Sequence, residues 1–260
     1  MFTKQQLMSQ LEKFQHIKGK IVTVHTSLKA VGEIECGGET LLSALIEFFV
    51  QGGGLLCVPT HTWNSNVYDR RTNDSCTGIL SKLAAAHPKA IRTLHPTHSM
   101  AVFGNRERVE WFVSNEATAD TTANPKGCYG KLLEEDGYVL LIGVGQNKNT
   151  FIHCVEEMLE VPDRLTDFKV EKTIIHEDGT EEKRYLYWFD SKIPDVSIYF
   201  TKFEAPFRYH GCIEDGYIGN AKVQICSAKK MYRVIEEIYK KNNFGELLDN
   251  DLPIDEKLYK

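Results

Sequence analysis

The residues best suited to chemistry lie in the segment GVGQNKNTFIHCVEE, at positions 143–157. The apolar run YVLLIGVG (138–145) predicts a buried strand, and a helix is expected to begin near Thr150. His153 and Glu156 are three residues apart, so they share one face of that helix with Thr150. A carboxylate beside an imidazole stabilises its protonated form, which favours His153 as a general base. The same spacing also arises in surface His–Glu pairs that have no catalytic use.

Two further polar segments, LHPTHSMAVFG (94–104) and VHTSL (24–28), adjoin predicted strands. Hydroxyls and imidazoles on a turn stiffened by Pro96 can bind a phosphate or an amide, and His95 and His98 can also ligate a metal. Backbone N–H groups in the other segment can receive an acyl carbonyl. Plain structural turns explain both segments equally well.

The composition disfavours several classes of protein. The 260 residues are 42% hydrophobic and 26% charged, with 31 Lys and Arg against 36 Asp and Glu, a net charge of -5. Phosphate binders usually carry a basic excess, so nucleic acid is not expected as a partner, whereas a cationic small molecule is. The seven cysteines form no C-x-x-C pair. No stretch reaches the roughly 18 apolar residues of a membrane span. We expect a reduced, cytoplasmic protein without membrane association.

The order of predicted elements indicates an α/β fold. Residues 20–59 are predicted to form a strand, a helix and a strand, a unit that favours parallel strands covered by helices. Residues 60–78 are predicted to be a long polar loop, and residues 168–190 a hairpin, turning at an Asp-Gly pair, that extends the same sheet. A final amphipathic helix is expected at about 228–242. Without repeats or linkers, residues 1–260 are expected to form a single domain.

Three segments taken together resemble the aminoglycoside 3-N-acetyltransferase family of antibiotic-modifying enzymes. They are VHTSLKAVGEIECGGETLLSALIEFFVQGGGLLCVPTHTWN, LHPTHSMAVFG and YVLLIGVGQNKNTFIHCVEE, and their order also matches the family. The resemblance runs from about residue 20 to 165 and continues faintly beyond. It implies a three-layer α/β/α domain. With the predicted hairpin, we expect a mixed central sheet with an antiparallel extension in the C-terminal third.

The resemblance also implies a reaction. Family members transfer an acetyl group directly from acetyl-coenzyme A to the 3-amino group of a 2-deoxystreptamine aminoglycoside, without a metal. The T-x-x-H-x-x-E motif places the general base at His153 and its carboxylate partner at Glu156. The hydroxyl of Thr97 is a candidate donor to the thioester oxygen. A homodimer is left open.

The same resemblance implies a binding site for coenzyme A. The family's H-S-S-L turn corresponds to HTSL at 25–28, and the H-P-T-H-S segment is expected near the thioester and pantetheine arm. The implied coenzyme A contacts are His25, Thr26, Ser27, Leu28, Lys29, His95 and Ser99. Two stretches, GCYGKL (127–132) and RRTNDSC (70–76), are unusual for the family and leave the acceptor open.

Several alternatives stay open. The acceptor can be a different amine, and carboxylates that can bind it are Asp69, Asp74, Glu157 and Glu214. A zinc-dependent hydrolase using His25, His95, His98 and His153 is a rival, although no compact ligand motif supports it. A non-catalytic coenzyme A or sugar-binding module is another. An acyl-enzyme on Cys154 is disfavoured because neighbours on a helix point about 100° apart.

Overall fold

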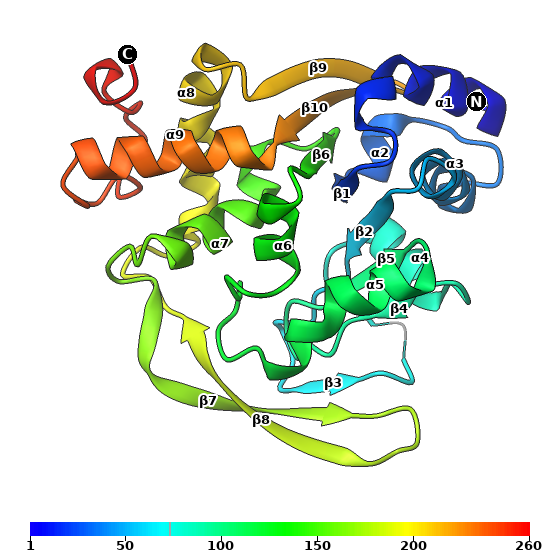
Figure 1. Ribbon diagram of the computed structural model, residues 1–260, viewed down its shortest axis with the longest axis horizontal. Helices are drawn as coiled ribbons and strands as arrows, with labels where there is room; N and C mark the ends of the chain where they lie inside the picture. The colour runs from blue at the N-terminus through cyan, green and yellow to red at the C-terminus, as the bar shows by residue number, and fades with distance from the viewer. Residues whose placement is uncertain (73) are drawn as a thin grey trace.

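The computed structural model describes residues 1–72 and 74–260 (Figure 1). Asn73, part of the polar stretch 70–76, lies outside the described residues. The main sheet has the order β4-β5-β2-β1-β6-β10-β9. Its strands are β1 (Ile21–Thr26), β2 (Leu55–Pro59), β4 (Ile91–Arg92), β5 (Met100–Phe103), β6 (Tyr138–Ile142), β9 (Ile213–Ile218) and β10 (Ala221–Ser227).

The sheet is mixed, as predicted. At its centre β1 pairs in parallel with β2 and with β6, in a register that places Thr26 beside Ile142. The outer pairs β2–β5, β4–β5, β6–β10 and β9–β10 are antiparallel. The carboxyl ends of β1, β2 and β6 therefore meet at one edge, where α/β sheets bind ligands.

Helices cover both faces of the sheet, which gives the predicted three layers (Figure 1). Alternate strand residues serve each face, so Val22 and Val24 pack on one helical layer while Ile21 packs on the other. One layer holds α1 (Lys4–Leu11), η1 (Glu12–Ile17), α2 (Leu28–Val31), α3 (Gly38–Gln51) and α4 (Ile79–Ala86). The other holds α5 (Arg106–Val113), α6 (Cys128–Glu134), α7 (Phe151–Met158), η4 (Val196–Phe203), α8 (Glu204–Tyr209) and α9 (Ala228–Lys241). Three short 3-10 helices complete the chain: η2 (Ser114–Thr118), η3 (Gln146–Lys148) and η5 (Glu256–Leu258).

The predicted hairpin forms, but it does not extend the main sheet. Its strands are β7 (Leu165–Ile175) and β8 (Glu181–Phe189). β7 pairs with β8 on one side and with β3 (Val67–Asp69) on the other, in a separate three-stranded sheet that Figure 1 shows apart from the helical layers. β7 and β8 carry many exposed charged positions, whereas the central strands are buried on both faces. The antiparallel extension comes instead from β9 and β10. The prediction that residues 60–78 are only loop is also wrong, because β3 lies within them.

No helix among the described residues is long and apolar enough to cross a membrane.

Candidate active site

A cavity of about 920 Å³ lies at the carboxyl ends of β1 and β2. His25 and Thr26 contribute from the end of β1. The loop and helix that follow β6 contribute residues between Val144 and His153, and the end of β8 with the segment after it contributes residues between 188 and 200. Cavities at this edge of an open α/β sheet are the usual ligand sites of such folds. His153 therefore lies where the sequence predicts the chemistry.

His153 is held by the packing of its ring. Phe189 and Phe200 contact it edge-on, with centroid distances of 4.5 and 4.7 Å. The side chain is 18% exposed, and its Nδ1 lies 3.9 Å from Glu156 Oε2. That distance exceeds a hydrogen bond but keeps the two groups in electrostatic contact; catalytic hydrogen bonds are often long in ligand-free enzymes. Nδ1 has no hydrogen-bond partner among the described residues, and neither has Glu156 Oε2.

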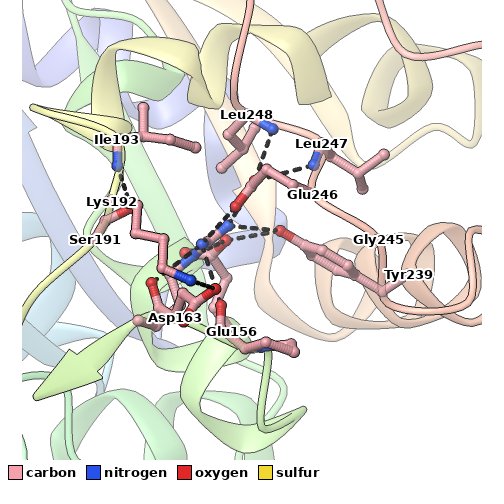
Figure 2. A network of polar contacts seen from close by, with 12 residues as sticks. Glu156, Asp163, Ser191, Lys192, Ile193, Tyr239, Gly245, Glu246, Leu247 and Leu248 are labelled. Carbon is pink, nitrogen blue, oxygen red and sulfur yellow. Dashed lines mark hydrogen bonds and ion pairs between the residues drawn. The ribbon is translucent and has the colours of Figure 1, made fainter.

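Glu156 is completely buried and forms part of a polar network (Figure 2). Its Oε1 accepts hydrogen bonds from Arg164 Nε at 3.0 Å and from the Tyr239 hydroxyl at 2.7 Å. The other side of the Arg164 guanidinium binds both carboxylate oxygens of Glu246 at 2.9 Å. Oε2 is thus left facing His153. Sequence spacing predicts the His153–Glu156 pair, but it does not predict the cation and hydroxyl behind it.

Burial keeps the imidazoles of the cavity neutral. Burial lowers the pKa of His25 from 6.5 to about 4, and burial together with Arg164 lowers the pKa of His153 from 6.5 to about 3. The pKa values of His61 and His98 are also well below the usual range, first because both are buried and then because other histidines surround them. A neutral imidazole is the form that can accept a proton, but burial disfavours the charged form, so His153 needs the Glu156 carboxylate beside it to hold that proton.

The predicted coenzyme A turn is only partly on the cavity wall. His25 and Thr26 line the cavity, and His25 Nε2 and Thr26 Oγ1 are buried without a partner among the described residues. Ser27 caps α2, and its N–H donates to the carbonyl of Ile142 at 2.9 Å. Leu28 and Lys29 follow within α2, and none of Ser27, Leu28 and Lys29 is on the wall. The unpartnered atoms of His25 and Thr26 can therefore hydrogen-bond a ligand in the cavity.

The H-P-T-H-S turn is held mainly by its own hydrogen bonds. His95 Nδ1 accepts from the N–H groups of Thr97 and His98 at 3.2 and 2.9 Å, and its Nε2 bonds the carbonyl of Thr121. Ser99 Oγ donates to the Thr60 carbonyl at 2.8 Å. His95, Thr97 and Ser99 are all buried and lie behind the cavity wall. Their polar groups are used to shape the turn, and direct contacts of these three residues with the thioester or pantetheine stay a prediction.

Two wall residues that sequence reasoning did not assign to catalysis or binding are His61 and Trp63. Both follow β2, and the His61 ring packs at a tilt against the rings of Trp63 and His98, at centroid distances of 5.0 and 4.6 Å. Thr97 Oγ1 lies 2.9 Å from His98 Nδ1 and so orients the His98 ring. The signal was available in the sequence, because PTHTW (59–63) directly follows the buried run of β2.

The candidate acceptor carboxylates lie elsewhere. Asp69 pairs with Arg71, and Glu214 pairs with His16. Glu157 accepts hydrogen bonds from Thr122 and Ala123 behind the wall. Asp74 accepts a hydrogen bond from Thr72. None of the four lines the cavity, whereas Asp190 and Asp195 do.

A metal site and a covalent cysteine are the alternative chemistries. Among residues 1–72 and 74–260, no group of three His, Cys, Asp or Glu side chains is placed to hold a metal ion. Cys154 is fully buried in the core beside the sheet, and burial raises the pKa of its thiol well above the usual range. It is not a residue of the cavity wall.

The model of the aminoglycoside 3-N-acetyltransferase family matches residues 23–240. Aminoglycoside N(3)-acetyltransferase IV of Salmonella sp is 27% identical over 161 residues, which are 61% of this chain and 60% of that protein. The YokD protein of Bacillus subtilis, described as acetyltransferase-like, is 25% identical over 59% of this chain and 64% of its own length. The chain thus spans less than two thirds of either relative.

Solved structures share the fold. AAC-IIIb with bound CoASH superimposes with a TM-score of 0.77 at 21% identity, covering 95% of this chain and 98% of that one. A histidine-to-alanine variant of AAC(3)-IVa in complex with a gentamicin gives a TM-score of 0.74 at 21% identity, covering 93% and 90%. The predicted α/β/α fold is confirmed.

Proposed function

The chain belongs to the aminoglycoside 3-N-acetyltransferase family, and from this premise we propose that it transfers an acetyl group from acetyl-coenzyme A to an amine. The acceptor expected from the family is the 3-amino group of a 2-deoxystreptamine aminoglycoside. The observation that carries the proposal is His153, which is neutral, faces a cavity of about 920 Å³ and has a buried carboxylate behind it.

His153 takes the proton from the amine. Its Nδ1 faces Glu156, so Nε2 is the nitrogen available to the acceptor. As the imidazole becomes charged, Glu156 stabilises it. Burial raises the pKa of Glu156, and Arg164 opposes that rise and so favours the ionised carboxylate. The amine nitrogen attacks the thioester carbonyl, the C–N bond forms, the C–S bond breaks, and the thiolate leaves and is protonated to free coenzyme A.

The end of β1 binds the donor. Thr26 Oγ1 has no other partner among the described residues, so it can donate to the carbonyl oxygen as negative charge develops there. His25 Nε2 is the neighbouring buried atom that can bond the pantetheine amide. Support for coenzyme A as donor comes from the fold shared with AAC-IIIb, whose structure holds CoASH.

Two further predictions belong to this proposal. A cytoplasmic location fits seven cysteines that are all unpaired in the structure and a reaction that consumes acetyl-coenzyme A. A single domain over residues 1–260 fits a main sheet whose strands come from positions 21 to 227, with a packed core on each face.

The proposal is tested by following thiol release from acetyl-coenzyme A with a panel of amines, with the product identified by mass spectrometry and the acetylated nitrogen located by NMR. Amine-dependent release with an N-acetylated product is expected. If acetyl-coenzyme A is bound but no amine releases the thiol, the chain is a binding module and the proposed reaction is wrong.

A further inference from the structure

The cavity wall carries little negative charge. Among the described residues its carboxylates are Asp190 and Asp195, both exposed, and one lysine, Lys148, adds a positive charge. No ion pair of the described residues includes either aspartate. The wall can therefore neutralise about two ammonium groups. Each further ammonium meets only neutral acceptors such as Asn149 Oδ1, which compensate a lost hydration shell less well than a carboxylate does.

The rest of the wall suits neutral groups with a flat face. Trp63 is 42% exposed and lies 5.0 Å from the His61 ring and 5.6 Å from the His98 ring, centroid to centroid. Such a surface packs well against the apolar face of a sugar or cyclitol ring.

His61 adds a specific hydrogen-bonding requirement. It is 1% exposed, and neither of its ring nitrogens has a partner among the described residues, although the residue lines the cavity. A neutral imidazole offers one N–H donor and one acceptor nitrogen. A hydroxyl group can satisfy either of them, whereas an ammonium can satisfy only the acceptor. Buried polar groups left unpaired cost about 1–3 kcal/mol, so a hydroxylated ligand is favoured here.

We propose that the acceptor of this chain is a hydroxylated amino sugar or aminocyclitol with one or two ammonium groups, and that polycationic aminoglycosides are poor acceptors. The proposal rests on the proposed N-acetyl transfer. In the proposed complex, the ring of the acceptor packs on Trp63 and one of its hydroxyls hydrogen-bonds His61. The ammonium that is not acetylated pairs with Asp190 or Asp195.

The experiment compares free 2-deoxystreptamine, a diamine, with gentamicin, which carries more ammonium groups. Calorimetry in the presence of coenzyme A gives the Kd of each, and thiol release gives kcat/KM. We expect both quantities to favour 2-deoxystreptamine by at least about tenfold, which corresponds to about 1.4 kcal/mol. Tighter binding of gentamicin would overturn the inference whether or not either amine is acetylated. Loss of turnover with the expected binding order would overturn the proposed reaction alone.

Charge variants of the wall give an independent test. Ser197→Asp adds a carboxylate to the cavity wall, and Ser9→Asp, on the exposed surface of α1, makes the same change of net charge elsewhere. Ser197→Asp is expected to tighten gentamicin binding by roughly two- to fivefold, the size of a partly exposed ion pair, and Ser9→Asp to leave it unchanged. Equal effects of both variants would show that overall charge, and not the wall, governs acceptor choice, and would contradict the inference.

Discussion

The network behind His153 makes a quantitative prediction about stability. Glu156 is 0% exposed and Arg164 2% exposed, and the guanidinium binds Glu156 on one side and Glu246 on the other. Arg164→Leu leaves the Glu156 carboxylate buried without its cation. Breaking a buried ion pair by removing one partner costs about 3–5 kcal/mol, so we expect a loss of that size in the free energy of unfolding at pH 8.

The loss is expected to depend on pH. Burial already raises the pKa of Glu156, and removal of the arginine raises it further, so this carboxyl binds a proton in the folded variant at a higher pH than in the unfolded chain. The variant therefore recovers stability relative to the unmodified protein as pH falls from 8 towards 5.5.

Urea unfolding followed by circular dichroism measures both effects. Arg106→Leu, which removes an exposed partner of Glu110, is the matched control and is expected to cost no more than about 0.5 kcal/mol. The double variant Arg164→Leu with Glu156→Gln is expected to be more stable than Arg164→Leu alone. A cost below about 1 kcal/mol for Arg164→Leu, or a double variant less stable than the single one, would refute the reasoning.

Three further predictions concern His25, Gly143 and Thr97. The lowered pKa of His25 means that the unfolded chain binds a proton below pH 6.5 and the folded chain only near pH 4. Keeping His25 neutral therefore contributes about 3 kcal/mol to the free energy of unfolding, and this is lost as pH falls from 6.5 to 4. Urea unfolding of a His25→Gln variant should show a flatter dependence on pH. Gly143 has φ +66°, and a Cβ there would collide with the side chain of Ala30. Gly143→Ala should therefore lower the free energy of unfolding by at least about 1–2 kcal/mol, and an unchanged melting curve would contradict this. Thr97→Val removes the group that orients His98, so it should raise KM for the acceptor more than it lowers kcat, while Thr97→Ser should retain both constants.

Much of the fold could be predicted because apolar periodicity reflects burial. The buried runs of β1, β2 and β6 and the amphipathic α9 are found at the predicted positions. The hairpin at 168–190 was predicted as a hairpin but assigned to the wrong sheet. Alternation of apolar and polar residues predicts that two neighbouring segments form a hairpin. It does not predict that β7 also pairs with β3, about 100 residues earlier in the chain.

The site was predictable only where its residues are close in sequence. The helical spacing brings His153 and Glu156 together, and the structure does so as well. The hydroxyl of Tyr239 comes from 83 residues away and could not be inferred from local spacing. Thr97 was predicted to lie near the thioester. In the structure its hydroxyl lies 2.9 Å from His98 Nδ1, a contact inside the turn that the sequence pattern does not reveal.

The measurement that tests the central claim most directly is the kcat/KM of amine-dependent thiol release by the unmodified protein and by His153→Ala, with the Kd for acetyl-coenzyme A measured alongside. General-base catalysis contributes about 10²–10⁴-fold, so the account predicts a fall of that size in the variant with an unchanged Kd. A variant that keeps the kcat/KM of the unmodified protein would contradict the assignment of His153 as the base.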